Sequence, residues 1–287
     1  MRPPAIEKMG YYPTHEEVAE VISTYISPAS ERGRLLDPCC GEGKAASMLG
    51  QKLNCETWGA ELSYRRAAIA EATMNRVYQA PWESTWLTPE SVSFLFLNPP
   101  YDTDSIDNQG RLEAGFLKST TPALMRGGLL VYIIPQKMFA NAEIAKRLVT
   151  YYKDFKTGLY KDSAYRQAIL FATKRDTTHI PEAEEVETVV AWGKADLDVL
   201  ESAASPVYQL LPSPVRGLNN QPIVFKRKDW TDEETVNATL SKGVMQTSVW
   251  KDLLNPKRSE TGAVSPVMPL KRSEERRVGK ECRSRWS

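Results

Sequence analysis

The stretch from residue 33 to residue 43 reads GRLLDPCCGEG, a short apolar run followed by an acid and two glycines. Glycines at such a place let the backbone turn tightly and approach a ligand where a side chain would collide. Many strand-to-helix turns also need a glycine for structural reasons alone, so the turn must be interpreted together with its surroundings. We expect a strand over 33–36, a turn that contains Asp37, Gly41 and Gly43, and a helix over 44–53.

On either side of this turn the chain alternates short apolar runs with amphipathic stretches. The alternation over residues 11–175 is the pattern of βαβ units around a parallel sheet and predicts an α/β fold. The run FLFL at 94–97 is apolar on both faces, as expected for a central strand covered by helices on either side. Thr14 and Glu17 have the spacing of a capping box at the first helix. The expected strands are 33–36, 56–60, 92–97, 128–135 and 168–173, and the expected helices are 15–27, 44–53, 64–75 and 142–152.

A chain of 287 residues, 41% hydrophobic and 25% charged, is long enough for one α/β domain and a smaller unit. The pattern changes after residue 176, where an acidic stretch is followed by one rich in Pro, Ser and Asn. We therefore expect a second unit over 177–271 with short strands or irregular structure. Within it, FKRKDW at 225–230 is interpreted as a solvated basic turn, with a contact to a nucleic-acid backbone as the alternative.

The last sixteen residues, 272–287, read RSEERRVGKECRSRWS and abandon the preceding pattern. They look like the in-frame translation of a sequencing-library adapter, and the alternative is a genuine basic tail. Six Lys or Arg and three Glu give this segment a charge of +3, so the remaining chain carries +1 − 3 = −2. Net charge therefore gives no argument for nucleic-acid binding, and function must be inferred from individual sites.

Several broad classes of protein are excluded by the composition. No apolar run approaches the roughly 18 residues of a membrane span, and the first residues do not form a secretory signal. Four Cys and two His are too few and too scattered for a structural zinc site or a disulfide framework. We therefore expect a cytoplasmic protein in a reducing compartment, with no membrane partner and no metal.

Glu61 adds a second acid near the glycine turn, at the end of the second expected strand. A carboxylate at this position can accept both hydroxyls of a ribose, as an adenosine-containing cofactor requires. Asp37, which precedes the glycines, would repel a pyrophosphate but suits the cationic methionine part of S-adenosylmethionine. Nicotinamide cofactors are therefore disfavoured, and Ala45 after Lys44 lacks the hydroxyl of a P-loop. The turn favours S-adenosylmethionine.

The motif NPPY at 98–101 directly follows the expected strand 92–97. With this motif the sequence resembles the NPPY-motif, S-adenosylmethionine-dependent N6-adenine DNA methyltransferases, over roughly residues 10–175. The resemblance implies a Rossmann-like, doubly wound methyltransferase sheet. It also implies an S-adenosylmethionine-binding catalytic domain over 1–176 and a target-recognition or accessory region over 177–271. The glycine turn precedes NPPY, and this motif order resembles the gamma arrangement, in which target recognition is C-terminal.

The NPPY residues suit transfer to an exocyclic adenine amine, whose lone pair is delocalised into the ring. The side-chain oxygen of Asn98 and the backbone carbonyl of Pro99 can accept both amino hydrogens and direct the lone pair at the methyl group. Pro99 and Pro100 hold the loop rigid, so these acceptors are preorganised. Tyr101 offers a face on which the target base can stack, worth about 1–3 kcal/mol.

Further site residues follow from the resemblance. Tyr12 and Thr14, within GYYPT at 10–14, resemble the opening motif that caps the cofactor pocket near the methionine carboxylate; Thr14 can also be a simple N-cap. Reaching adenine N6 in a duplex requires flipping the base out of the DNA. Tyr160, within LYKDS at 159–163, is the candidate for a second stacking wall, and an ordinary Tyr at a strand edge is the alternative.

The sequence departs from the family at the third strand, which commonly ends in an acid that contacts the cofactor adenine. Here Gln79 could make a neutral hydrogen bond and Trp82 could stack, and neither role is assigned. The segment SPVMPLK at 265–271 resembles a less characterised group of bacterial NPPY methyltransferase-like proteins whose chain continues further, so we expect that the adapter-like tail replaces a native C-terminus.

Three functions remain open at this point. The first is methylation of adenine N6 in DNA. The second is methylation of an RNA amine or of a glutamine amide in a protein, since NPPY suits any planar amino group. The third is a non-catalytic relative that binds nucleic acid or a protein partner.

Overall fold

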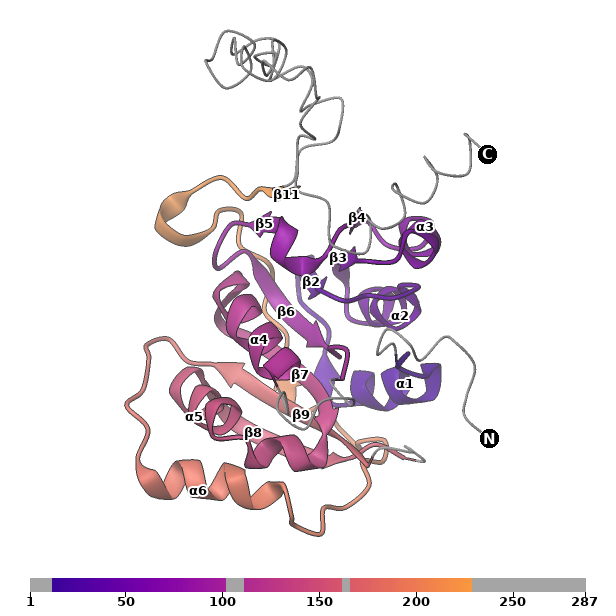
Figure 1. Ribbon diagram of the computed structural model, residues 1–287. Helices are drawn as coiled ribbons and strands as arrows, with labels where there is room; N and C mark the ends of the chain where they lie inside the picture. The colour runs from indigo at the N-terminus through magenta and orange to yellow at the C-terminus, as the bar shows by residue number, and fades with distance from the viewer. Residues whose placement is uncertain (1–11, 102–110, 162–165, 229–287) are drawn as a thin grey trace, which may run out of the picture. The chain divides into compact units, whose positions relative to one another are not determined.

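A seven-stranded sheet forms the centre of the computed structural model, which describes residues 12–101, 111–161 and 166–228. The first five strands of its order are parallel, and β9 runs antiparallel to both of its neighbours (Figure 1). The α/β, doubly wound fold predicted from the sequence is confirmed. The order across the sheet is β4 (Arg76–Gln79), β3 (Cys55–Glu61), β2 (Gly33–Asp37), β6 (Val92–Leu97), β7 (Leu124–Pro135), β9 (Gln167–Lys174) and β8 (Tyr152–Leu159).

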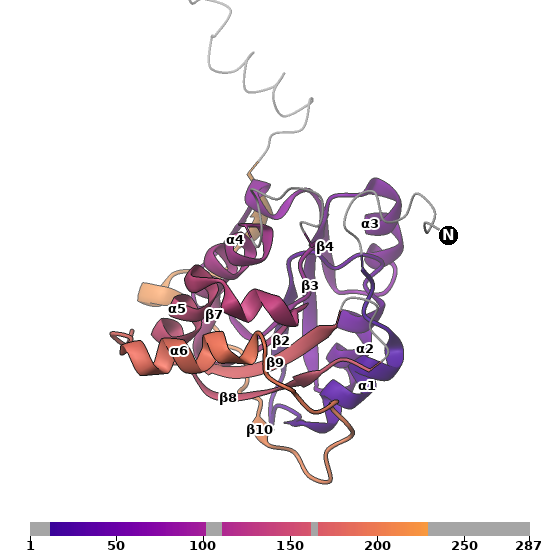
Figure 2. The ribbon, with the colours of Figure 1, turned by 60° about the horizontal axis from the view of Figure 1, so that its bottom comes forward.

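Helices cover both faces of this sheet (Figure 2). Successive strand residues point to opposite faces, so Leu35 and Phe94 pack with the first group of helices while Leu36 and Leu95 pack with the second. All four side chains are fully buried, which explains why the central strands are apolar on both faces. The first group is α1 (Glu16–Thr24), α2 (Lys44–Lys52) and α3 (Tyr64–Glu71), and the second is α4 (Arg111–Thr120), α5 (Ala142–Tyr151) and α6 (Ala183–Trp192).

The described residues after 176, 177–228, pack on the same sheet rather than apart from it. Two short pairings tie them to earlier segments: β10 (Tyr208–Gln209) runs parallel to β1 (Ile26–Ser27), and β11 (Phe225–Arg227) runs antiparallel to β5 (Thr85–Leu87). One compact unit accordingly extends to Asp229, so the expected boundary after residue 176 does not coincide with its end. A second unit begins at Trp230, and all of it, including the segments 265–271 and 272–287, lies outside the described residues. Single 3₁₀ turns occupy Trp82–Ser84, Thr121–Ala123, Gln136–Ala140 and Leu218–Asn220.

Two expected helices end three or four residues earlier in the structure. The first ends at Thr24 rather than at residue 27, because Ile26 and Ser27 pair with β10. The third ends at Glu71 rather than at residue 75, where the Asn75 side chain accepts hydrogen bonds from the Thr57 backbone N–H at 2.9 Å and from the Thr57 hydroxyl at 3.2 Å.

The expectation of short strands or irregular structure over 177–271 missed the helix α6. The backbone N–H of Glu182, just before the helix, donates to the Glu185 carboxylate at 2.9 Å, a local bond that favours helix initiation. Val189 on this helix is 2% exposed and belongs to the core cluster that contains α5 residues. This packing against the sheet domain was not visible as periodicity in the sequence.

The expected solvated turn at 225–230 is also corrected over its described part. Phe225 begins β11, is 2% exposed and stacks on Trp58 with ring centroids 5.5 Å apart and an interplanar angle of 12°. Burial of this aromatic ring against Trp58 holds the segment as a strand on the sheet domain, while Lys226 and Lys228 remain exposed to solvent.

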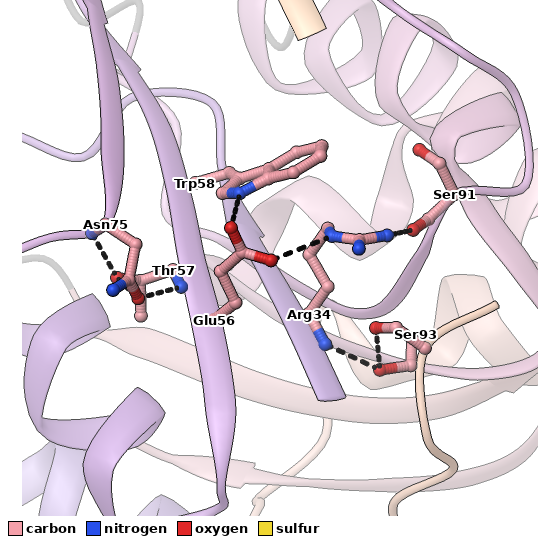
Figure 3. Close-up of polar contacts among 8 residues, drawn as sticks. Arg34, Glu56, Thr57, Trp58, Asn75, Ser91 and Ser93 are labelled. Carbon is pink, nitrogen blue, oxygen red and sulfur yellow. Dashed lines mark hydrogen bonds and ion pairs between the residues drawn. The ribbon is translucent and has the colours of Figure 1, made fainter. Parts of the chain in front are cut away.

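Polar side chains connect strands β2, β3 and β6 on one side of the sheet (Figure 3). The Arg34 guanidinium lies 3.5 Å from the Glu56 carboxylate and donates to the Ser91 carbonyl at 2.6 Å. The same carboxylate accepts from Trp58 Nε1 at 2.8 Å, and the Arg34 backbone N–H donates to the Ser93 hydroxyl at 3.1 Å. A shift of one strand would break several of these bonds, so they help to fix the register.

The two central strands β2 and β6 lie side by side and parallel, with Leu35 opposite Phe94. Their carboxyl ends therefore meet at one edge of the sheet, where the strand order reverses direction. Ligands of open α/β sheets bind at such a switch point. In the described part of the chain, no helix is long and apolar enough to cross a membrane.

We predict that Glu56→Gln lowers the free energy of unfolding by about 1–3 kcal/mol, because it leaves the half-buried Arg34 guanidinium without its carboxylate. Denaturant unfolding followed by circular dichroism measures the change. Glu20→Gln is the matched control, since the Glu20–Lys52 pair at 2.7 Å is exposed and its loss should cost less than about 0.5 kcal/mol. Equal effects of the two substitutions would contradict the register role.

Candidate active site

A cavity of about 1320 Å³ opens at the carboxyl ends of the parallel strands. Most site residues predicted from the sequence line it, although they come from five separate segments of the chain. Gly41 and Pro99 do not border the cavity. The predicted residues that line it are Tyr12, Thr14, Asp37, Gly43, Glu61, Asn98, Pro100, Tyr101 and Tyr160.

The turn at 37–43 requires its glycines. Gly41 and Gly43 have φ values of 57° and 77°, in the left-handed region that L side chains rarely adopt. A Cβ atom on Gly43 would lie 2.9 Å from Met74 Sδ and 3.1 Å from Ala70 Cα, so a side chain there would also collide. The Cys40 N–H donates to the Ala60 carbonyl at 3.0 Å and holds the turn against β3.

Glu61 is 5% exposed and its carboxylate is held by four hydrogen bonds. Oε1 accepts from the Ser63 N–H at 2.7 Å and from two guanidinium nitrogens of Arg66 at 3.0 and 2.7 Å. Oε2 accepts from the Gly41 N–H at 3.0 Å. Oε2 is therefore the oxygen with capacity left for a ligand hydroxyl, and we expect one strong bond to a ribose from it rather than an equal bond from each oxygen.

Arg66 was not found by sequence reasoning. It lies in the first turn of α3, five residues after Glu61, and it also lines the cavity. An acid at a strand end followed by a cation in the next helical turn is a weak signal by itself. Its meaning depends on the helix folding back over the strand end, which brings the guanidinium onto Oε1.

Asp37 is a second buried carboxyl at the cavity wall, with 4% exposure. Burial raises its pKa to about 7, the nearby Glu61 adds to this increase, and a hydrogen bond from the Cys39 N–H at 3.1 Å opposes it. A buried carboxyl with a raised pKa gains its charge more readily when a cation lies beside it. The site therefore fits the positively charged part of a ligand.

Asn98 has every part of its amide held. Nδ2 donates to the Tyr12 carbonyl at 2.9 Å and to the Thr14 hydroxyl at 3.0 Å, and Oδ1 accepts from the Tyr101 hydroxyl at 2.8 Å. Thr14 is thus not the N-cap of α1; that position is His15, and the Thr14 hydroxyl binds Asn98 instead. These bonds join the opening segment to the NPPY loop across more than eighty residues of sequence.

A further contact comes from Cys39, which sequence reasoning did not assign. Its thiol donates to the Asn98 backbone carbonyl at 3.1 Å, so the glycine turn and the NPPY loop are bonded directly. Burial raises the pKa of this thiol well above its usual range, so it stays protonated and can donate.

Tyr101 and Tyr160 both line the cavity but are largely buried, with 4% and 9% exposure. The Tyr101 ring stacks on Tyr12, with centroids 5.0 Å apart and an interplanar angle of 17°. The Tyr160 hydroxyl accepts from the His15 backbone N–H at 3.1 Å. Tyr12 therefore already covers one face of Tyr101, and contact with a target base stays a prediction for both tyrosines.

The structure distinguishes Gln79 from Trp82, the two residues near the third strand to which the sequence assigned no role. Trp82 is 8% exposed, lines the cavity and donates from Nε1 to the Ser119 hydroxyl at 3.0 Å. Gln79 donates to the Leu62 carbonyl at 3.0 Å and does not border the cavity. Trp82 is thus the one of the two that can meet a ligand.

The described residues fit S-adenosylmethionine. Asp37 faces the cavity as a buried acid suited to a cationic group, Glu61 offers Oε2 to a hydroxyl, and the glycine turn lets the backbone lie close to the ligand. Within the described residues, no three His, Cys, Asp or Glu side chains group as metal ligands would.

Comparison with known proteins identifies the family. The sequence model of the uncharacterised methyltransferase family DUF6094 matches residues 5–210. The chain belongs to this family. The matched range contains every predicted site residue and extends past residue 176, in agreement with the packing of later residues on the sheet domain. Membership of the DUF6094 methyltransferases agrees with S-adenosylmethionine as the cofactor. No match was found among curated proteins.

Solved methyltransferase structures resemble the DUF6094 chain distantly. The tRNA (m1A58) methyltransferase of Aquifex aeolicus has 13% identity and a TM-score of 0.44, over 58% of this chain and 72% of that one. A predicted O-methyltransferase of Agrobacterium tumefaciens has 15% identity and a TM-score of 0.41, over 72% and 91%. The 16S rRNA N2 G1207 methyltransferase of T. thermophilus, solved with AdoMet and guanosine, has 15% identity and a TM-score of 0.41, over 58% and 42%. Likeness at these values carries no information about substrate.

We predict that the affinity for S-adenosylmethionine rises as the pH is raised from 6 to 8, because Asp37 then ionises through its pKa of about 7 and attracts the cationic ligand. Isothermal titration calorimetry at several pH values measures this. Asp37→Asn keeps the acceptor for the Cys39 N–H and is the matched variant. It should bind more weakly at pH 8 and lose the part of the pH dependence that Asp37 causes.

The same substitution should stabilise the ligand-free protein at pH 8. The folded pKa of Asp37 lies above its ordinary value of 3.8, so folding takes up a proton between about pH 4 and 7 and stability falls as the pH rises through that range. Asp37→Asn removes this penalty. A variant less stable than the wild type at pH 8 would contradict the raised pKa.

Proposed function

We propose that this DUF6094 methyltransferase transfers the methyl group of S-adenosylmethionine to the exocyclic N6 of adenine in DNA. The observation that carries the proposal is the position of Asn98. Asn98 lines the same cavity as Asp37 and Glu61, because β6 and β2 are neighbours in the sheet. An amine acceptor and a cofactor pocket thus share one space.

The chain's own residues supply what a weak amine nucleophile needs. S-adenosylmethionine, when bound, supplies an activated methyl group on a sulfonium. A side-chain carbonyl oxygen can accept two hydrogen bonds, so Asn98 Oδ1 keeps capacity for an amino hydrogen beside the bond from Tyr101. The Pro99 carbonyl is the second acceptor that the motif implies, but Pro99 does not border the cavity, so the proposal rests on Asn98. Because Asn98 is already held from both ends of its amide, it needs little rearrangement when the amine arrives.

The size of the cavity supports a substrate group held beside the cofactor. Small-molecule pockets commonly measure about 300–1,000 Å³, and the cavity of about 1320 Å³ exceeds that range. It therefore has room for the cofactor and for one flipped base or one side chain. Tyr101 and Tyr160, which line the cavity, are the proposed aromatic contacts for the flat face of this group.

The choice of DNA rests on the NPPY motif and on the order of motifs along the chain. Target recognition is proposed for residues after 176, of which 177–228 lie against the sheet domain.

The acidity of the cavity supports a second candidate, the glutamine amide of a protein. The described acids at its lining include Glu16, Glu17, Glu42 and Glu83. Two of its cations are engaged with acids: Lys44 is paired with Glu42 at 2.9 Å and Arg66 with Glu61. A polyanionic backbone is bound by free cations, whereas a neutral amide carries no such requirement.

We predict that tritiated S-adenosylmethionine labels a DNA pool when the protein is incubated separately with DNA, RNA and protein. Asn98→Ala should lower this labelling by about 100-fold or more, because it removes the amine acceptor. Cofactor affinity should change far less, since Asp37 and Glu61 are retained. Gln221→Ala is the control, an exposed amide outside the cavity, and should label as the wild type does.

The outcomes separate the candidate functions. Label confined to protein would replace the DNA assignment with the glutamine amide, and label confined to RNA would replace it with an RNA amine. Cofactor binding without label in any pool would favour a non-catalytic relative.

A further inference from the structure

Gln167 is a buried amide in a strand that is otherwise nearly all apolar. It begins β9, whose sequence is QAILFATK, and it is 8% exposed. Burying an amide costs free energy unless it is hydrogen-bonded. Its side-chain Nε2 donates to the hydroxyl oxygen of Tyr101, the last residue of the NPPY motif, which lies 66 residues earlier. The strand thus carries a polar group aimed at the proposed active site.

The directions of the hydrogen bonds that link Tyr12, Asn98, Tyr101 and Gln167 all follow from the Tyr12 carbonyl. The Tyr12 carbonyl can only accept, so the Asn98 group that faces it must be the NH2 group. Oδ1 of Asn98 therefore faces Tyr101 and needs a donor. The Tyr101 hydroxyl has a single hydrogen, and once this hydrogen is given to Asn98 the oxygen can only accept. Gln167 supplies the matching donor.

The strand holds this donor in a fixed place. Gln167 pairs with Pro135 of β7, and its backbone carbonyl accepts from the Tyr160 N–H at 2.8 Å. A side chain that starts from a paired strand is positioned more accurately than one that starts from a loop. Burial also raises the pKa of Tyr101, so its hydroxyl keeps the hydrogen that Asn98 accepts.

We propose that Gln167 is a positioning residue that acts through the Tyr101 hydroxyl to hold Asn98 Oδ1 in place for the substrate amine. This proposal rests on the proposed function for its catalytic consequence. Without the donor of Gln167, the Tyr101 hydroxyl loses the bond that directs its hydrogen to Asn98. The bond from Tyr101 to Asn98 Oδ1 is then less firmly oriented, and the bonds from Nδ2 to Tyr12 and Thr14 hold more of the amide's position.

A role in stability alone does not explain the contact as well. An apolar residue of similar length would fill the same space in β9 without the cost of burying an amide. Gln136 offers the comparison within the same protein: it is 3% exposed, and its Nε2 donates to the carbonyls of Trp192 and Ala195, away from Asn98. Both glutamines are buried and bonded, but only Gln167 is bonded to the NPPY motif.

The test compares Gln167→Met, which removes the donor at nearly constant length, with Gln136→Met as control. We expect Gln167→Met to lower kcat on the labelled pool by about 10–100-fold while the affinity for S-adenosylmethionine stays within about twofold. Gln136→Met should lower stability but leave kcat within about twofold. Tyr101→Phe should lower kcat similarly, and adding Gln167→Met to it should lower kcat little further, because the two residues act as a unit.

Gln167→Glu tests the role through the pH dependence of kcat, which should not change if Gln167 only fills space. Above the pKa of the new carboxyl group it accepts the Tyr101 hydrogen and competes with Asn98, so kcat should fall at least as far as in Gln167→Met. Below that pKa the protonated carboxyl can donate, and kcat relative to the wild type should recover. A ratio of variant to wild-type kcat that does not change with pH would overturn the proposal.

A measurement on the substrate-free protein separates this proposal from the proposed function. In NMR spectra the side-chain NH2 signals of Asn98, assigned by their loss in Asn98→Ala, report how firmly the amide is held. We expect their hydrogen exchange to be at least about tenfold faster in Gln167→Met than in the wild type or in Gln136→Met. Unchanged exchange would overturn the positioning role even if the protein methylates DNA. Faster exchange in a protein that labels no pool would support the positioning role and reject the catalytic one.

Discussion

The parallel pairing of β2 with β6 is the constraint on which the rest of the site depends. Each strand ends in a segment that lines the cavity, the acid–glycine turn after β2 and the NPPY loop after β6. Parallel neighbours place their carboxyl ends at the same edge, and the reversal of strand order there leaves a space between the flanking loops. The thiol of Cys39 bonded to the Asn98 carbonyl is the direct link between the two segments.

The two buried acids at this edge, Glu61 and Asp37, differ in how many hydrogen-bond donors surround them. Glu61 has Arg66 and two backbone N–H groups as partners, whereas Asp37 has one backbone N–H and a raised pKa. The fold thus satisfies one acid internally and leaves the other dependent on its surroundings. A cationic ligand restores the charge of Asp37, so binding offsets a cost that the ligand-free fold carries.

Unlike Asp37, the amide of Asn98 has a hydrogen-bond partner on each of its polar atoms. Tyr12 and Thr14 reach it from the segment before α1, and Tyr101 reaches it from the same loop with Gln167 behind. The opening segment therefore serves the NPPY loop directly. Thr14 does not cap the first helix, although its spacing to Glu17 suits a capping box, because its hydroxyl accepts a hydrogen bond from the half-buried amide of Asn98.

The sequence by itself determined the strands of the sheet's centre, the glycine turn, the two acids and the NPPY loop. The strands follow from local apolar periodicity, and the turn and the loop follow from the backbone preferences of glycine and proline. Those features predicted the α/β class and most of the residues that line the cavity. Only the tertiary structure decided which groups complete the site. Arg66, Cys39 and Gln167 act through contacts that depend on helix and strand placement, and nothing in their local sequence distinguishes them from ordinary surface or core residues. The same reason explains α6 and β11, whose apolar side chains find their partners on the sheet domain rather than within their own segments.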